Sequence, residues 1–467
     1  MPAGTSSQPP SAERASSFLE ADRRHVWHPF AQMQEYLEHP TLAVVSGKGG
    51  WLTDSEGRTY LDGNASLWTN VHGHNDRDLN AALRRQLDRV AHSTMLGLTH
   101  PIGAELAAEL SGLAPPGLGR VFFSDNGAGA VEVALKLSFQ YWQLTGRAEK
   151  RGVIGLAGGY HGDTFGAMAV GDSGFFHDRF RPWCFPAAHF PAPHCREWAG
   201  RVRSADSSGS LAGLRELLSQ RAGETACLIL EPSVQGAAGM RLQPPGFVAA
   251  VAELCRAHEV HLILDEVFVG FGRLGSMLVC VQERVRPDFL CLAKGLTAGY
   301  LPLAATLAQD EIFSAFLGSY SSRRAFFHGH TFTGNPLAAA VAVENIRKLR
   351  PLIADGTLRE SVAFFGRKLE QILAGHPGVL EIRQRGLAAA LDLRPAEVND
   401  RPAGDGERPA MDLRVGLRVC LAARNHGLLL RPLGDSLLLV PPLCLSHGEI
   451  GQLVDRTAAA LDDTYNH

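Results

Sequence analysis

The sequence lacks the features that mark several common classes of protein. It has no apolar run that approaches the length of a membrane span, and residues 1–17 are rich in Ser, Pro and Ala without the apolar stretch of a secretory signal. The formal net charge is −3, which gives no electrostatic case for nucleic acid or an anionic membrane as a partner. We therefore expect a soluble, cytoplasmic protein.

Several catalytic and metal-binding signatures are also missing. The eight cysteines are scattered without a CxxC pair, so they predict buried reduced thiols and neither a disulfide framework nor a zinc site. No GxSxG motif occurs, and serine hydrolysis therefore has no support. The pairs in His72-Gly73-His74 and His328-Gly329-His330 have no partner ligands at metal-binding spacing, which favours structural or substrate-side histidines and no metal. Residues 270–275 match GxGxxG, but no βαβ unit with an acidic ribose ligand surrounds them, so we reject a dinucleotide site.

What is present is the pattern of a large α/β protein. With 467 residues, of which 45% are hydrophobic and 50 are glycine, the chain should divide into two or more domains. From Phe123 to Lys294, short apolar runs alternate with segments of helical spacing, which predicts a largely parallel sheet covered on both faces. Residues 187–210 and 395–411 have the composition of loops. After Leu358 the composition changes, and this end of the chain reads as a separate small α+β domain.

Charged side chains stand at the ends of two of the predicted strands. The apolar run 261–264 ends on Asp265 and Glu266, and the run 288–292 is followed by Lys294 between small residues. Ligands of open α/β sheets bind at the carboxyl ends of the strands. A lysine that forms an imine and an aspartate that holds a pyridinium nitrogen are what a pyridoxal phosphate enzyme requires. From this stretch alone, two ordinary surface charges at strand ends explain the pattern equally well.

Two glycine-containing loops are candidates for the rest of a ligand site. The strand 120–123 leads into the small-residue loop 124–130 and then into a helix over 131–143, an arrangement that presents backbone N–H groups to a phosphate. An ordinary βα turn would look the same, and the lysine of a nucleotide loop is absent. In the loop 158–164, glycines flank Tyr160 and allow its ring to approach a flat ligand.

Taken together, these motifs resemble the class III (subgroup II) aminotransferases, which are fold-type I pyridoxal phosphate enzymes. The resemblance extends from about Trp27 to the C-terminus. It is carried by these blocks: Trp27-His28-Pro29-Phe30, Leu61-Asp62-Gly63, His72-Gly73-His74-Asn75, Ser124-Asp125-Asn126-Gly127, residues 160–168, Val234-Gln235-Gly236-Ala237, Asp265-Glu266-Val267, Gly270-Phe271-Gly272-Arg273, Ala293-Lys294-Gly295, residues 328–336 and Arg431-Pro432-Leu433-Gly434.

The resemblance implies an α/β architecture with two domains. The large domain would carry a mostly parallel sheet of the seven-stranded type, and a small α+β domain would be built from both ends of the chain. The expected boundaries are a disordered tail over 1–20, the N-terminal part of the small domain over 21–75, the large cofactor-binding domain over 76–345, and the C-terminal part of the small domain over 346–467.

The family's residue roles can be placed on matching positions of this sequence. Lys294 would form the internal aldimine and move the substrate proton, Asp265 would keep the pyridine nitrogen protonated, and Tyr160 would act beside them in catalysis. Pyridoxal 5'-phosphate would be bound by Asn126, Gly127, Ala128, Tyr160, His161, Asp265, Val267, Lys294 and Thr331. Substrates would contact Phe30, Trp68, Asp163, Arg273, Gly329 and Arg431. Thr331 would come from the other subunit, which implies an obligate homodimer with its active site at the interface.

Within the family, the motifs favour amination of 8-amino-7-oxononanoate to 7,8-diaminononanoate in biotin biosynthesis. Phe30, Leu67 and His330 resemble the branch in which lysine replaces adenosylmethionine as amino donor, so either donor is retained. Phe268-Val269 and Asn126 depart from the usual residues and should tune cofactor binding. The alternatives are an ω-amino acid:pyruvate aminotransferase of the same class and a non-catalytic pyridoxal-phosphate-binding homologue.

Overall fold

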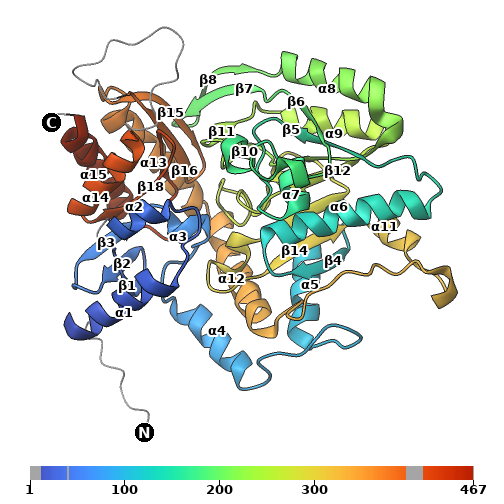
Figure 1. Ribbon diagram of the computed structural model, residues 1–467, viewed down its shortest axis with the longest axis horizontal. Coiled ribbons are helices and arrows are strands. Elements are labelled where there is room, and N and C mark those ends of the chain that lie inside the picture. The colour runs from blue at the N-terminus through green and yellow to red at the C-terminus, as the bar shows by residue number, and fades with distance from the viewer. Residues whose placement is uncertain (1–11, 39–40, 396–413, 466–467) are drawn as a thin grey trace.

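The computed structural model describes residues 12–38, 41–395 and 414–465. Helices and strands form two parts: a large α/β part and a smaller part in which the blue N-terminal and the red C-terminal elements lie together (Figure 1). The helices are α1 Ala12–His25, α2 Met33–Glu38, α3 Ala65–Trp68, α4 Arg77–Leu87, α5 Pro101–Leu113, α6 Gly127–Leu144, α7 Phe165–Val170, α8 Ser208–Arg221, α9 Phe247–Ala257, α10 Val279–Gln282, α11 Asp310–Ala315, α12 Pro336–Ala354, α13 Thr357–Leu373, α14 Val415–Asn425 and α15 His447–Tyr465.

A seven-stranded sheet is the centre of the large part. Its order is β4-β14-β13-β12-β9-β5-β6, with bounds β4 Arg120–Ser124, β5 Gly152–Leu156, β6 Ala188–Phe190, β9 Thr225–Leu230, β12 His261–Asp265, β13 Phe289–Leu292 and β14 Ala304–Ala308. Only β14 runs antiparallel to its two neighbours. The connection from β13 to β14 is too short for the crossover that a parallel neighbour requires. The predicted mostly parallel sheet is confirmed.

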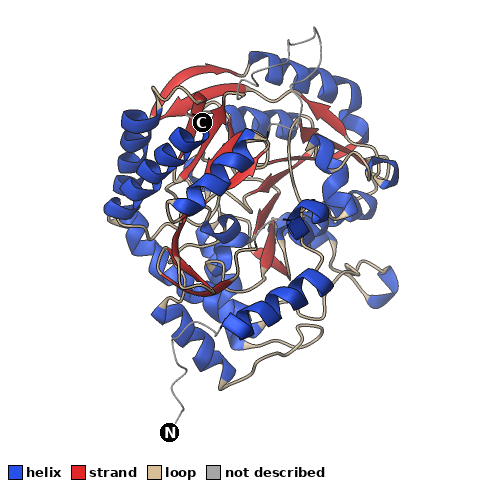
Figure 2. Ribbon diagram, turned by 60° about the vertical axis from the view of Figure 1, so that its left-hand side comes forward, coloured by secondary structure: helices blue, strands red, loops and turns tan. Residues whose placement is uncertain are grey.

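Helices cover both faces of this sheet, as the red strands between blue helices show (Figure 2). Alternate residues of β12 belong to different hydrophobic clusters because successive side chains of a strand point to opposite faces. Ile263 packs in the cluster that contains Val131 and Ala134 of α6. Leu262 and Leu264 pack in the cluster that contains α9 and α12. The continuous apolar run of β12 is therefore explained by burial on both sides.

The smaller part joins the two ends of the chain. Strands β1 Val44–Lys48, β2 Trp51–Asp54 and β3 Thr59–Asp62 form an antiparallel meander. Strand β17 Leu428–Leu429 extends it by pairing in parallel with β3. A second sheet has the order β15-β16-β19-β18, with bounds β15 Val379–Arg385, β16 Ala388–Leu393, β18 Arg431–Leu433 and β19 Ser436–Leu439. Helices α13, α14 and α15 pack together beside these strands.

Several local predictions differ from the structure. Helix α1 begins inside the predicted disordered tail, because Ala, Glu, Arg and Leu in this segment are good helix formers although Ser and Pro precede them. Residues 1–11 lie outside the described residues, as does 396–413, most of the predicted loop insert. Helix α15 was not predicted. The expected domain boundary at 345/346 falls within α12, which is one continuous helix.

The predicted loop 187–210 contains three strands: β6 and the hairpin of β7 His194–Trp198 with β8 Arg201–Asp206. The hairpin meets the smaller part through an ion pair of Arg196 with Glu381 and one of Arg203 with Glu370 at 2.7 Å. The backbone N–H of Ala199 also donates to the side chain of a residue in β15 at 2.8 Å. Because these partners are distant in sequence, local composition does not reveal the strands. A further short hairpin pairs β10 Val234–Gln235 with β11 Arg241–Leu242.

No helix in the described part of the chain has the length and apolar character to cross a membrane. All eight cysteines lie within that part and none forms a disulfide; six of them are buried.

Candidate active site

A cavity of about 720 Å³ lies at the carboxyl ends of β12 and β13. The two strands are neighbours with Asp265 opposite Cys291, so the short loop after β13 brings Lys294 beside the end of β12. Twelve of the predicted site residues line this one cavity: Phe30, Trp68, Asn126, Gly127, Ala128, Tyr160, His161, Asp163, Asp265, Val267, Lys294 and Arg431. The structure thus brings together residues from both ends and the middle of the chain.

The Lys294 amine lies among aromatic rings. Its Nζ atom is 4.8 Å from the ring centre of Trp68 and 5.7 Å from that of Phe268. Burial lowers the pKa of Lys294, and the carboxylates of Asp265 and Glu231 act against this shift. A larger fraction of the amine is therefore neutral, and hence nucleophilic, than in an exposed lysine.

The Asp265 carboxylate is buried and oriented by two donors. The Nδ1–H of His161 donates to its Oδ2 at 2.7 Å, and the backbone N–H of Val267 donates to its Oδ1 at 3.0 Å. The Nε2 atom of His161 is buried and has no hydrogen-bond partner among the described residues. A buried carboxylate held in this way presents a fixed negative charge to a cationic ligand atom.

Glu231 is a site residue that the sequence analysis did not select. It follows β9, lines the cavity, and accepts the backbone N–H groups of Tyr160 at 3.1 Å and Gly236 at 2.9 Å. Burial raises the pKa of Glu231 to about 7, with His161 acting against the shift. The signal that identified Asp265, a buried strand ending on a carboxylate, is also present at Glu231.

The start of α6 forms the predicted small-residue loop. The side-chain oxygen of Asn126 caps the helix by accepting the N–H of Gly129 at 2.8 Å. Gly127 and Ala128 occupy the first turn, where backbone N–H groups have no partner within the helix. A Cβ atom on Gly127 would lie 2.7 Å from Val267, and one on Gly162 would lie 2.4 Å from the Cβ of Ala128. Glycine at both positions therefore permits the close packing beside this end of the cavity.

Tyr160 and Asp163 belong to a chain of hydrogen bonds. The Tyr160 hydroxyl donates to Asp163 Oδ2 at 2.9 Å, and the His177 Nε2–H donates to Asp163 Oδ1 at 3.0 Å. Ser173 Oγ lies 2.8 Å from His177 Nδ1, and the His177 ring stacks on the Tyr160 ring with centres 5.6 Å apart. Burial would raise the pKa of Asp163, but the bonds from His177 and Tyr160 lower it overall. The result is a fixed anion that is half exposed to the cavity.

Aromatic residues form the remaining walls. Phe268 packs on Trp68 with ring centres 4.8 Å apart, and both rings touch the position where a Cβ on Gly236 would lie. Phe30 meets the edge of Phe176 at 6.0 Å. Phe268 was expected to tune the cofactor pocket, and the structure places it in the wall beside Trp68 and the Lys294 amine.

Three predicted site residues do not line this cavity. The Arg273 guanidinium is buried and donates to the carbonyl oxygens of Leu387 at 3.0 Å and Pro441 at 2.6 Å. Burial lowers the pKa of Arg273 to about 9. These bonds join distant backbone segments, and the expected contact of Arg273 with substrate stays a prediction. Gly329 and Thr331 are exposed in the loop before α12.

The residues present fit pyridoxal phosphate. An amine of lowered pKa, a buried carboxylate with two donors and a helix start with free N–H groups line the same cavity, which matches the aldehyde, ring nitrogen and phosphate of that molecule. No group of three or more His, Cys, Asp or Glu side chains among the described residues is arranged to hold a metal ion.

Comparison with known proteins gives consistent matches along the chain. A family model described as "Aminotransferase class-III" matches residues 33–461. The adenosylmethionine-8-amino-7-oxononanoate aminotransferase of Geobacter sulfurreducens is 48% identical over 437 residues, which are 93% of this chain and 95% of that protein.

Solved structures agree with these matches. The crystal structure of the adenosylmethionine-8-amino-7-oxononanoate aminotransferase of Methanocaldococcus jannaschii is similar with a TM-score of 0.87 and 35% identity, covering 96% of this chain and 99% of that one. An amine transaminase from an uncultivated Pseudomonas species, in its PLP-bound form, has a TM-score of 0.82 and 34% identity, covering 94% and 98% of the two chains.

Proposed function

Because the chain belongs to the class III aminotransferases, which depend on pyridoxal phosphate, we propose that it aminates 8-amino-7-oxononanoate to 7,8-diaminononanoate in biotin biosynthesis. The observation that carries this proposal is the meeting of Lys294, Asp265 and Arg431 in one cavity that also contains the fixed anion Asp163. The acceptor bears a carboxylate and an ammonium group, and the cavity offers a guanidinium and a carboxylate to receive them.

The cofactor would be held by the residues at the carboxyl ends of the strands. When bound, pyridoxal phosphate supplies an aldehyde carbon and an electron-accepting ring. Asp265, oriented by His161, would stabilise positive charge at the ring nitrogen. The N–H groups of Gly127 and Ala128 and the side chain of Asn126 would receive the phosphate at the start of α6. Tyr160 and Val267 would flank the ring.

Lys294 would perform the proton transfer. Its amine is held near the end of β12, and burial keeps enough of it neutral to accept a proton from the substrate carbon. The rings of Trp68 and Phe268 form apolar walls beside the Nζ atom. Arg431, at the start of β18, would pair with a substrate carboxylate, and Phe30 would border the path of the substrate into the cavity.

We infer a homodimer with its active sites at the interface. Leu96, Leu98, Phe327 and Phe332 are large apolar residues that are 55 to 89% exposed. Their two loops are adjacent, because the rings of His92 and Phe332 lie 4.8 Å apart. Large exposed apolar residues gathered on adjacent loops are typical of protein interfaces. Since Thr331 lies in the same surface, a second copy would bring it towards the cofactor site of the first.

The test separates the proposed reaction from the alternatives. Purified enzyme loaded with pyridoxal phosphate is given lysine or adenosylmethionine as donor, with 8-amino-7-oxononanoate or pyruvate as acceptor. Formation of 7,8-diaminononanoate with either donor supports the proposal and identifies the donor. Transfer to pyruvate alone would make the protein an ω-amino acid:pyruvate aminotransferase. Cofactor absorbance without a half-reaction towards any amine would make it a non-catalytic homologue.

A further inference from the structure

The backbone around Lys294 has an unusual conformation. Lys294 and Ala298 have φ angles of +46° and +53°, in the left-handed region, and they bracket the 3-10 turn Lys294–Thr297. A non-glycine residue in this region costs about 1 kcal/mol or more and persists when surrounding contacts hold it in place. Within the turn, the N–H of Leu296 donates to Ala293 at 3.0 Å. The N–H of Ala298 likewise donates to the Gly295 carbonyl oxygen at 3.0 Å, and the remaining contact to the turn comes from another element.

That support is the side chain of Asn345 in α12. Its Nδ2 group donates to the carbonyl oxygen of Gly295 at 2.8 Å and to that of Leu296 at 2.9 Å, the two residues directly after Lys294. Asn345 is fully buried, and its Oδ1 atom has no hydrogen-bond partner among the described residues. The amide therefore gives the Gly295 carbonyl a second donor, besides the Ala298 N–H, and supplies the donor to the buried Leu296 carbonyl.

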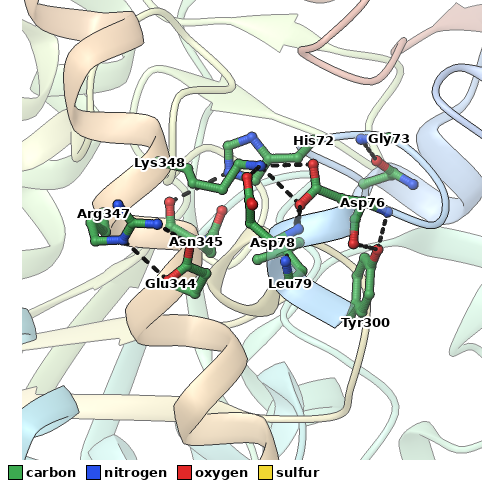
Figure 3. A network of polar contacts seen from close by, with 11 residues as sticks. His72, Gly73, Asp76, Asp78, Leu79, Tyr300, Glu344, Asn345, Arg347 and Lys348 are labelled. Carbon is green, nitrogen blue, oxygen red and sulfur yellow. Dashed lines mark hydrogen bonds and ion pairs between the residues drawn. The ribbon is translucent and has the colours of Figure 1, made fainter. Parts of the chain in front are cut away.

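The helix that carries Asn345 is itself fixed to α4. His72 Nε2 lies 3.4 Å from the carbonyl oxygen of Asn345, and Lys348 pairs with Asp76 at 2.8 Å and Asp78 at 2.7 Å (Figure 3). Asp76 also contacts the end of the segment that follows Lys294, because the Tyr300 hydroxyl donates to the Asp76 carbonyl oxygen at 3.3 Å. The segment from Lys294 to Tyr300 is thus held near its start and at its end by one network.

We propose that Asn345 is a positioning residue for Lys294. Its amide fixes the turn and so holds the Lys294 backbone in the left-handed conformation, which an unsupported loop would not keep. In that conformation the lysine amine projects towards the end of β12, beside Asp265. The proposal rests on the proposed role of Lys294 as the proton-transferring amine. Asn345 acts on that amine through the backbone and does not line the cavity.

The test uses Asn345→Asp and Asn345→Ala in the holoenzyme, with Ile346→Ala as the matched control. Ile346 is the next residue of α12 and is equally buried, but it is apolar and makes no hydrogen bond to the turn. At saturating donor, the single-turnover rate of both Asn345 variants should fall by roughly 10- to 100-fold, with the half-saturating donor concentration within about twofold of wild type. Ile346→Ala should lower the Tm and keep the single-turnover rate.

A pH profile adds a readout that a merely structural role would not change. The carboxylate of Asn345→Asp can only accept hydrogen bonds, whereas its protonated form donates one bond to the turn. The loss of single-turnover rate in Asn345→Asp, relative to wild type, should therefore become smaller as the pH falls. The loss of rate in Asn345→Ala should stay constant. Equal deficits at all pH values for both variants, or a wild-type rate in either, would overturn the proposal.

A second variant covers the case in which Asn345 variants do not fold. His72→Leu removes the contact to the Asn345 backbone and leaves the amide in place, so it should show a smaller loss of rate in the same direction. A wild-type rate in His72→Leu, in the absence of folded Asn345 variants, would count against the proposal. If wild type and Ile346→Ala show no half-reaction, the proposed function fails; if they react and the Asn345 variants match them, only the positioning role fails.

Discussion

The His161 imidazole and the Asp265 carboxylate meet at 2.7 Å in the buried floor of the cavity, although 104 residues separate them in the sequence. The contact fixes which way the carboxylate faces. Asp265→Asn keeps the size and the acceptor oxygen but removes the charge, so we expect the half-reaction to slow by roughly 100-fold or more. Rapid mixing with donor and absorbance at the cofactor band would measure it. A wild-type rate in the Asp265→Asn variant would refute the role assigned to this carboxylate.

The depressed pKa of Lys294 should appear in cofactor capture. Apoenzyme is mixed with pyridoxal phosphate across a range of pH, and the rate of the new absorbance band is recorded. Because burial lowers the pKa of this amine, the rate should reach its plateau at a lower pH than for a model lysine, whose pKa is about 10.4. Lys294→Ala is the control for the other lysines and should give no band. A midpoint at about 10.4, as for an exposed lysine, would contradict the burial of the amine.

Glu231 should make the protein less stable as the pH rises. The pKa of Glu231 is raised to about 7, so between roughly pH 4.5 and 7 the folded state binds its proton more tightly than the unfolded chain. The free energy of unfolding therefore falls through this window, by about 3 kcal/mol for this group, and changes little above it. Glu231→Gln removes this contribution. Denaturant titrations from pH 4.5 to 8 should show a shallower decline for the variant.

A second buried carboxyl group contributes to the same pH dependence of stability in both proteins. Burial also raises the pKa of Glu266 to about 7, and Glu266 is unchanged in both proteins. The prediction therefore concerns the difference between the two slopes, and identical slopes would show that Glu231 is not protonated in this range.

His177 should control the charge of Asp163. His177→Phe keeps a ring against Tyr160 but removes the hydrogen bond that lowers the pKa of Asp163. Loss of the bond raises the pKa of Asp163, so the variant carboxylate is protonated at a higher pH than in wild type. On acidification, binding of an ammonium group should therefore begin to weaken at a higher pH in the variant. The expected result is an acid limb of 1/KM, for the amine that contacts Asp163, displaced to higher pH. His177→Gln retains a hydrogen-bond donor, so its acid limb should lie between those of wild type and His177→Phe. Coinciding pH profiles for wild type and His177→Phe would exclude control of Asp163 by His177.

Mixed dimers test whether Thr331 acts across the interface. Chains with Lys294→Ala and chains with Thr331→Ala are co-expressed with different tags, and the mixed dimer is purified. If Thr331 serves the other subunit, one site of the pair contains both native residues, and about half of the wild-type activity per dimer is recovered at limiting cofactor. If Thr331 serves its own subunit, neither site is intact and activity stays low.

The strand-end chemistry was the part of the site that the sequence predicted best. Asp265 and Lys294 each follow a short apolar run, and such runs predict buried strands whose ends meet at a sheet edge. The start of α6 could also be predicted from the sequence, because Asn126 followed by small residues is a local signal for a capped helix. Each of these inferences needs only neighbouring residues and one rule about sheet geometry.

Contacts between distant segments were not predictable in this way. Arg273 stands in a motif shared with the family, yet its donors reach the carbonyls of Leu387 and Pro441. Asn345 is one polar residue within a helix, and nothing nearby in the sequence indicates that it bonds to the turn after Lys294. His177 lies in a segment without a recognisable pattern. Tertiary structure alone decides what each of these side chains faces.

The pairing of β3 with β17 has a consequence for synthesis of the chain. The edge of β3 is completed by Leu428 and Leu429, which are translated near the end of the protein. Because synthesis proceeds at about 5 to 20 residues per second, the edge of the N-terminal meander stays unpaired for on the order of tens of seconds. Open edges promote association between chains. A ribosome that stops before β17 would therefore release a product prone to aggregate, even though its seven-stranded sheet is already complete.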